Sequence, residues 1–129
     1  EGTFWLEAHH LVTEKGGLPM KEVPSCPVEA TSSLIGNKWK TLILYHLNSG
    51  TMRFNELKRA VHGISQKVLT HNLRELEQDG LIHRTVYAEV PPRVEYSLTK
   101  LGKSLQRVID SMSEWGREYQ CSIKKSREA

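Results

Sequence analysis

The chain has 129 residues, of which 38% are hydrophobic and 26% are charged. This size and composition predict one soluble globular domain and exclude a disordered chain. No apolar run approaches the roughly 20 residues of a membrane span, and the only cysteines, Cys26 and Cys121, exclude a disulfide framework and a thiolate zinc site. We expect a cytoplasmic protein with free thiols.

The net charge of +3 is distributed unevenly along the chain. Residues 1–36 carry two basic and five acidic side chains, a net charge of −3. Residues 37–107 carry twelve basic and six acidic side chains, a net charge of +6, and residues 108–129 carry four of each. A basic middle region is typical of a phosphate-binding surface, although a solvated helix face has a similar composition.

Residues 1–24 are expected to be an N-terminal extension without recognisable chemistry. Phe4, Ala8 and Leu11 have the spacing of a short amphipathic helix. Met20 could be the natural start, so we expect residues 1–19 to be an added or upstream segment.

Two helices are expected at the start of the organised region. Pro27 suits a first helical position, where its missing N–H would have no partner, and this helix should run to about Ile35. The next run, from Trp39 to Leu47, is apolar almost all round, which predicts a buried central helix.

Two further helices are joined by a tight turn. The first, about two turns over residues 54–61, stops at Gly63. Ser65 can cap the second, which ends at Asp79 and Gly80. Its expected buried stripe consists of Val68, Leu69, Leu73 and Leu76. Two helices joined in this way are a helix-turn-helix pattern.

After residue 80, the spacing of apolar residues changes from the helical pattern to one typical of strands. Residues 81–87 are rich in β-branched and aromatic side chains, and residues 93–98 alternate polar and apolar side chains. Pro91 and Pro92 bar both a helix and a central strand between them, so residues 88–92 form a turn. The predicted fold class is therefore mainly α with a small β-hairpin, a winged helix-turn-helix.

The last helix starts at Thr99 and carries a heptad-like seam. Its members are spaced by three and four residues: Leu101, Leu105, Val108, Met112, Trp115 and Tyr119. The seam could pack on the domain core, but it continues well past the hairpin, which favours a dimer interface. We expect the domain to span residues 25–119 and a C-terminal tail to span residues 120–129.

The helix after Ser65 presents polar side chains opposite its buried stripe. They are of the types that contact base edges and phosphates, and comprise Ser65, Gln66, Lys67, Thr70, His71 and Arg74. N-terminal positions enter the groove most deeply in this motif, so we expect base contacts up to His71 and a phosphate contact from Arg74. Any surface helix has a solvated polar face, but the position of this one in a helix-turn-helix favours DNA binding.

Two arginines flank this helix in sequence. Arg53 could clamp a phosphate. Arg93, beside the proline-stiffened hairpin tip, suits the narrow minor groove, or it could form an ion pair with Glu89 or Glu95.

Cys26 precedes a helix start, where the helix dipole stabilises an anion. A thiolate there could react with oxidants or electrophiles, or pair with Cys121 of a partner subunit; the alternative is an inert N-cap cysteine. The six histidines have no metal-ligand spacing, and no catalytic or phosphate-loop motif occurs. We therefore expect no enzyme activity, no metal and no cofactor.

A resemblance to a known family rests on several motifs in order: CPVE at 26–29, GNKWK at 36–40, RFNEL at 53–57, GISQKVL at 63–69, LRELEQDGL at 73–81 and VPPRVEYSLT at 90–99, then Leu101 and Gly102. Over about residues 25–119 the chain resembles the HxlR-type bacterial transcription regulators. Residues 1–19 depart from the family pattern.

The resemblance implies a homodimer of winged helices whose terminal helices form the interface. It implies binding to a pseudo-palindromic operator, with the Ser65 helix in the major groove and the Arg93 hairpin beside it. Some members sense quinones, aldehydes or disulfide stress through the cysteine that matches Cys26. In some of those, an intersubunit disulfide with a C-terminal cysteine follows, and Cys121 lies in the corresponding region.

The expected function is sequence-specific DNA binding by a homodimeric repressor that responds through Cys26 to an oxidant or electrophile. The alternative is a winged-helix module for protein–protein contact without DNA binding, against which the basic stretch 37–107 argues. A thiol enzyme would need a nearby histidine or a resolving C-x-x-C motif, and the sequence offers neither.

Overall fold

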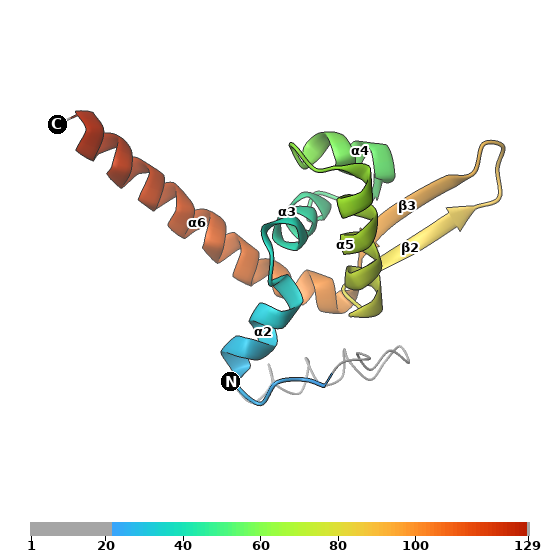
Figure 1. Cartoon of the computed structure of the whole chain (residues 1–129), viewed down its shortest axis with the longest axis horizontal. Coiled ribbons are helices and arrows are strands. Elements are labelled where there is room, and N and C mark those ends of the chain that lie inside the picture. Colours follow the sequence, from blue (N-terminus) through green and yellow to red (C-terminus); the bar gives the residue numbers. More distant parts are fainter. Residues whose placement is uncertain (1–21, 129) are drawn as a thin grey trace.

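The structure, a computed structural model, describes residues 22–128. The elements in this part of the chain are α2 (Pro27–Ile35), α3 (Lys38–Leu47), β1 (Met52–Arg53), α4 (Phe54–Ala60), α5 (Gln66–Gln78), β2 (Ile82–Tyr87), β3 (Arg93–Leu98) and α6 (Lys100–Glu128). Figure 1 shows α3, α4 and α5 grouped together, with the β2–β3 hairpin projecting on one side and α6 on the other. The predicted mainly α fold with a winged helix-turn-helix is confirmed. The short helix expected around Phe4–Leu11 lies outside the described residues.

Side-chain contacts cap the starts of α3 and α5, and the cap of α5 at Ser65 is the one that the sequence predicts. The Asn37 side-chain oxygen accepts a hydrogen bond from the Lys40 N–H at 2.9 Å and caps α3. The Ser65 hydroxyl oxygen accepts one from the Val68 N–H at 3.1 Å and caps α5. Each contact satisfies an amide that has no partner inside its helix, which stabilises the helix start by about 1 kcal/mol. The turn between α4 and α5 passes through Gly63 at φ +85°, a conformation that favours glycine.

The sheet has three antiparallel strands in the order β1-β3-β2. The hairpin pairs Ile82 with Leu98 at its base and Tyr87 with Arg93 near its tip. The third strand, β1, was not predicted: it pairs Met52 with Tyr96 and Arg53 with Glu95. Two residues are too few to show an alternating pattern, so this strand is defined only by its partner. Its effect is to attach the start of α4 to the wing.

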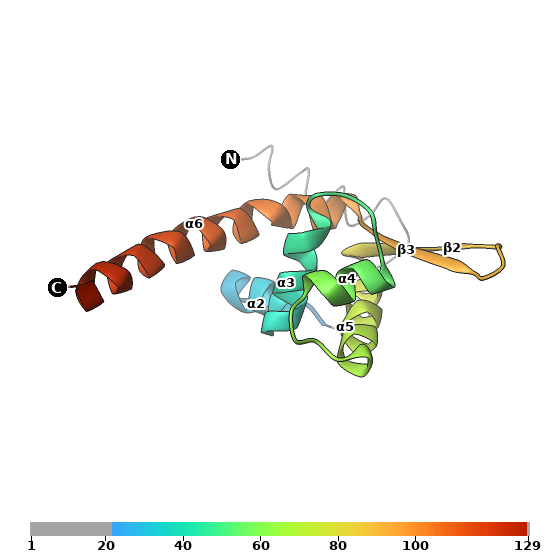
Figure 2. The same cartoon turned by 90° about the horizontal axis from the view of Figure 1, so that it is seen from above.

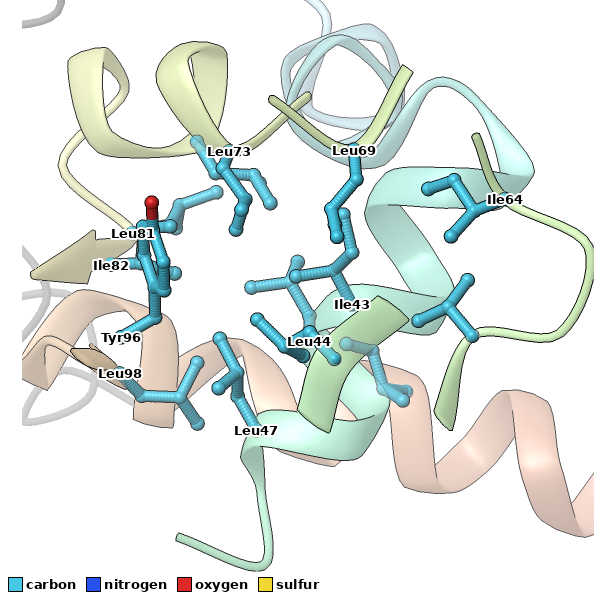
Figure 3. Packing of buried hydrophobic residues seen from close by; sticks show 14 residues of the cluster. Ile43, Leu44, Leu47, Ile64, Leu69, Leu73, Leu81, Ile82, Tyr96 and Leu98 are labelled. Atoms are coloured by element: carbon cyan, nitrogen blue, oxygen red, sulfur yellow. The ribbon is translucent and has the colours of Figure 1, made fainter. Parts of the chain in front are cut away.

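The hydrophobic core lies between α3, α5, the hairpin base and the first part of α6. Figure 3 shows Ile43, Leu44 and Leu47 of α3 facing the α5 leucines and the hairpin residues. The buried set is Ile43, Leu44, Leu47, Leu57, Val61, Ile64, Leu69, Leu73, Leu76, Leu81, Ile82, Tyr96, Leu98 and Ile109. Each fully buried aliphatic side chain stabilises the fold by roughly 1.5–3 kcal/mol. The core therefore fixes α5 against α3, with the opposite face of α5 outward.

The predicted central helix, α3, is less uniformly buried than its composition suggests. Tyr45 is 48% exposed, whereas Lys40 is only 5% exposed. Partial exposure is ordinary for a tyrosine, whereas a lysine is almost never buried unless it is paired. The buried ammonium group of Lys40 therefore requires a partner of opposite charge.

The first part of α6 is attached firmly to the domain. Thr99 donates a hydrogen bond from its hydroxyl to the Gly80 carbonyl oxygen at 2.6 Å and accepts one from the Gly102 N–H at 3.0 Å. A Cβ on Gly102 would overlap the Leu81 carbonyl oxygen, so only glycine allows this approach. The Gln106 side-chain amide donates to the Leu44 carbonyl oxygen at 3.1 Å.

The rest of α6 extends away from the other elements (Figures 1 and 2). Its buried residues are Gly102, Gln106 and Ile109, all in its first half. Residues 120–128, which we expected to form a tail, continue the same helix to Glu128. Across residues 22–128, no helix combines the length and the apolar character that crossing a bilayer requires.

Candidate nucleic-acid interface

The outward face of α5 brings together most of the residues predicted to contact DNA. Gln66, Lys67, His71 and Arg74 are exposed, and Thr70 is half-buried among them. These five side chains line one shallow hollow on the surface. The hollow offers an amide, two cations, an imidazole and a methyl group, which are the groups that meet base edges and phosphates in a major groove.

Two of the predicted contact residues already use part of their polar group within α5. The Ser65 hydroxyl oxygen accepts the Val68 N–H. The Thr70 hydroxyl donates to the Gln66 carbonyl oxygen at 2.8 Å. The Ser65 cap defines where the helix starts, and the Thr70 methyl group is the part of that side chain left for an apolar contact.

His71 lies beside an acidic residue that the sequence analysis left unassigned. Its Nε2 is 3.4 Å from Glu75 Oε1, one helical turn away, and its side chain is 69% exposed. The same Glu75 oxygen lies 2.9 Å from Nζ of the buried Lys40. The carboxylate therefore contacts α3 on one side and the outward face of α5 on the other.

A neutral link between the same two helices lies close by. The Asn37 side-chain amide donates to Asn72 Oδ1 at 3.2 Å, and the Asn72 amide donates to the Val68 carbonyl oxygen at 2.8 Å. Asn72 is only 3% exposed. Sequence reasoning missed it, although one signal was present: it stands three residues after Leu69 and four before Leu76, within the buried stripe.

Arg53 and Arg93 both line one groove between α4 and the wing. The groove is lined by residues 53–56, Arg59 and residues 89–94. The Arg53 side chain is exposed, and its backbone N–H donates to Glu56 Oε1 at 2.8 Å, which begins α4. β1 places Arg53 opposite Glu95 of β3, so the strand that the sequence did not reveal is what brings the two arginines to one groove.

The Arg93 guanidinium makes one of the two ion pairs considered from the sequence. It lies 3.3 Å from Glu89 Oε1 and 4.0 Å from the centroid of the Tyr87 ring. Its side chain is 29% exposed. The ring and the carboxylate hold the guanidinium at the wing, where it contributes positive charge with a restrained geometry.

The predicted seam on α6 divides into two parts. Leu101 and Leu105 pack against the core of the same chain. Beyond them, Met112, Trp115 and Tyr119 are 47%, 66% and 54% exposed. The rings of Trp115 and Tyr119 are stacked, with centroids 5.5 Å apart and an interplanar angle of 9°. Core packing thus accounts for the first part of the seam, and the second part is an exposed apolar face.

Both cysteines are exposed and have free thiols. Cys26 is the N-cap residue of α2, and its side chain makes no capping hydrogen bond. Cys121 lies in the last third of α6, beyond the buried part of that helix. Among the described residues, no three His, Cys, Asp or Glu side chains are grouped as they would be around a metal ion.

Comparisons with known proteins agree with this geometry. A family model described as HxlR-like helix-turn-helix matches residues 34–124. YdeP, an HTH-type transcriptional regulator of Bacillus subtilis (strain 168), is 54% identical over 100 residues, which cover 78% of this chain and 78% of YdeP.

Two redox-related structures are also similar. The oxidised form of the redox regulator HypR has a TM-score of 0.69 and 52% identity, covering 72% of this chain and 96% of HypR. The reduced form of the transcriptional regulator YodB from Bacillus subtilis has a TM-score of 0.64 and 39% identity, covering 74% of this chain and 95% of YodB. The chain belongs to the HxlR-like helix-turn-helix family and is a DNA-binding transcription regulator.

Proposed function

We propose that the protein is a homodimeric repressor whose two α5 helices bind successive major grooves of a pseudo-palindromic operator. The observation that carries this proposal is the outward face of α5, where Gln66, Lys67, Thr70, His71 and Arg74 line one hollow opposite the buried stripe. Two recognition helices about 34 Å apart would reach half-sites one duplex turn apart. Occupation of a promoter by such a dimer would block transcription.

Each group on α5 has a role that follows from its position. Gln66 and Lys67 lie in the first turn and can reach adenine and guanine edges, respectively. The Thr70 methyl group can contact a thymine methyl group, because the Thr70 hydroxyl hydrogen is used within the helix. Arg74 lies two turns further along and is assigned to a phosphate.

The wing and the start of α4 would contact the DNA backbone beside the major groove that α5 occupies. Arg53 is exposed and lines the groove between α4 and the wing. Arg93 lines the same protein groove, where it contacts Glu89 and Tyr87. The potential near a narrow minor groove is strongly negative, which favours an arginine placed there without rearrangement.

The second copy would cover the exposed apolar face of α6. This face consists of Met112, Trp115 and Tyr119, and the half-buried Ile123 continues the same spacing. Large exposed apolar side chains in a row on one helix are typical of an interface. A two-fold axis between the α6 helices of the two subunits would arrange two identical winged helices symmetrically, as a symmetric operator requires.

Cys26 is proposed to make DNA binding sensitive to oxidants or electrophiles. It is exposed at the N-terminus of α2, and Cys121 is exposed on α6. Support comes from the similar redox regulator HypR, solved in oxidised and reduced forms, and from YodB, solved after diamide treatment. In a disulfide step, the thiols of Cys26 and of Cys121 in the second subunit lose two protons and two electrons to diamide, which becomes a hydrazine.

The DNA-binding proposal is tested with duplexes selected by the protein from a random library. Lys67→Ala and Arg74→Ala should each weaken binding about tenfold, and Arg74→Ala should reduce the salt dependence by about one phosphate contact. Lys124→Ala, on the far part of α6, is the matched control and should bind as the wild type does. Unchanged binding in both α5 variants would refute the assignment of α5 to the major groove.

The thiol proposal is tested by adding diamide to the protein bound to the same duplex. Diamide should lower the affinity of the wild type and leave Cys26→Ser unaffected. A dimer-sized band on a non-reducing gel that both Cys26→Ser and Cys121→Ser abolish would identify the second sulfur. Equal responses of the wild type and Cys26→Ser would refute the role of Cys26.

The alternative of a protein–protein module makes the opposite prediction for DNA. A module of that kind would show no affinity for duplex DNA that falls steeply with salt. The basic stretch of residues 37–107 and the family of the chain both favour the DNA-binding function.

A further inference from the structure

A buried lysine lies directly behind the polar face of α5. Lys40 of α3 is 5% exposed, and lysine is almost never fully buried unless it is paired. Its Nζ lies 2.9 Å from Glu75 Oε1. The same oxygen lies 3.4 Å from Nε2 of the exposed His71. One carboxylate oxygen thus contacts a buried ammonium on one side and an exposed imidazole on the other.

We propose that Lys40 is a positioning residue for base reading: it fixes the Glu75 carboxylate, and that carboxylate holds the His71 ring in one orientation toward the DNA. Lys40 itself would touch no DNA. The inference rests on the proposed function, in which the outward face of α5 contacts bases. It adds a specificity-determining residue on a helix that is not the recognition helix.

The physical argument concerns the restraint on Glu75. A glutamate on a helix surface samples several rotamers, and an exposed histidine–glutamate pair four residues apart has little strength of its own. The buried Lys40 ammonium has lost its water and requires the carboxylate, so the carboxylate is held in place. The side chain of Glu75 is 29% exposed, which leaves it accessible to His71.

The restraint decides which part of His71 faces a base. The contact to Glu75 engages Nε2, so Nδ1 is the ring nitrogen left for a base edge. Without Lys40, the Glu75 carboxylate would lose its buried cationic partner and would hold the His71 imidazole less firmly. His71 would then discriminate poorly among base pairs, although α5 would still lie in the groove.

Other contacts hold the backbone of α5 in place without Lys40. Asn72 accepts a hydrogen bond from the Asn37 amide at 3.2 Å and is 3% exposed. Leu69, Leu73 and Leu76 are buried against the core. Replacement of Lys40 is therefore expected to disturb the orientation of His71 more than the position of the helix.

The test compares the base preferences of variants along a half-site. Duplexes that bind each variant are selected from a random library at fixed salt and sequenced, and melting followed by circular dichroism checks that each variant is folded. His71→Ala identifies the base pair that His71 reads. Lys40→Met should reduce the preference at that same base pair about fivefold or more and leave the preferences at other base pairs within twofold.

A matched control lies in the same turn of α3. Lys38 is an exposed lysine whose ammonium lies 4.5 Å from the centroid of the Trp39 ring. Lys38→Met makes the same chemical change and should leave the whole preference profile unaltered. If Lys40→Met does not fold, the double variant Lys40→Met/Glu75→Leu removes both members of the ion pair, so that no unpaired charge is left behind, and should show the same local loss.

The outcomes separate this inference from the function on which it rests. An unaltered profile in Lys40→Met, beside a local change in His71→Ala, would overturn the role of Lys40 alone. A uniform loss at every base pair would also overturn it, because that pattern means displacement of α5. If neither Gln66→Ala nor His71→Ala changes any preference, both the inference and the assignment of α5 to base reading fail.

Discussion

The two longest helices of the described chain, α5 and α6, are both amphipathic, but the structure covers their apolar faces to different extents. The inward face of α5 is closed: Leu69, Leu73 and Leu76 are at most 2% exposed. The apolar face of α6 is covered as far as Ile109 and is then open at Met112, Trp115 and Tyr119. Burial of the apolar face of α5 fixes the position of its opposite, polar face, whereas the exposed apolar face of α6 is suited to contact with a partner. The outward face of α5 is suited to a polyanion, and the open part of α6 is suited to an apolar surface.

The largest loss of stability is expected from truncation of a buried side chain on the inward face of α5. Leu73→Ala removes a side chain that is 2% exposed and should lower the free energy of unfolding by about 2–5 kcal/mol, measured by urea denaturation. Val86→Ala, at a wing residue that is 53% exposed, should change it by less than about 0.5 kcal/mol. Similar losses in the two variants would contradict the placement of the core.

The next effect concerns the open face of α6. Trp115→Glu places a charge at the centre of the exposed apolar row and should weaken dimerisation about 30-fold or more, measured by sedimentation velocity. Arg117→Gln changes the net charge by the same amount on the opposite side of α6 and should leave the dimer intact. A wild-type protein that remains monomeric at high concentration would refute the proposed interface.

A smaller effect is expected at the start of α5. Ser65→Ala removes the oxygen that accepts the Val68 N–H and should lower the free energy of unfolding by about 1 kcal/mol. Ser32→Ala, at an exposed position inside α2, should be neutral or slightly stabilising. A neutral Ser65→Ala would show that the cap contributes little and that the core alone defines the start of the helix.

The same contrast explains what could be predicted from the sequence. Elements whose apolar spacing is satisfied inside one chain, such as α5 with its stripe and the hairpin with its prolines, were predicted with their type and order. β1 could not be, because two residues have no period and Met52 and Arg53 are strand only through their pairing with β3. We expected a tail from residue 120, but α6 continues to Glu128, because the residues after Tyr119 contain no glycine or proline to end a helix.

The residues of the candidate site also divide into those that could be predicted from the sequence and those that could not. Residue type and helical position were enough to select the outward residues of α5. Burial of Lys40 could not be predicted, because its partner Glu75 lies 35 residues away and only the packing of α3 against α5 brings them together. An ion pair of Arg93 with Glu89 or Glu95 was considered from the sequence, and the structure shows the pair with Glu89 across the hairpin turn.

The close approach of Gly102 to the Leu81 carbonyl oxygen has a mechanical consequence. The contact joins α6 to the segment that leaves the end of α5, and the buried Ile109 is the last point at which α6 is held against the domain. From Ile109 to Glu128 the free arm of α6 is roughly 28 Å long. A tilt of a few degrees where the arm leaves the domain would move its far end by a few ångströms. In a dimer joined through these arms, the distance between the two α5 helices would therefore depend on the angle at which α6 leaves the domain.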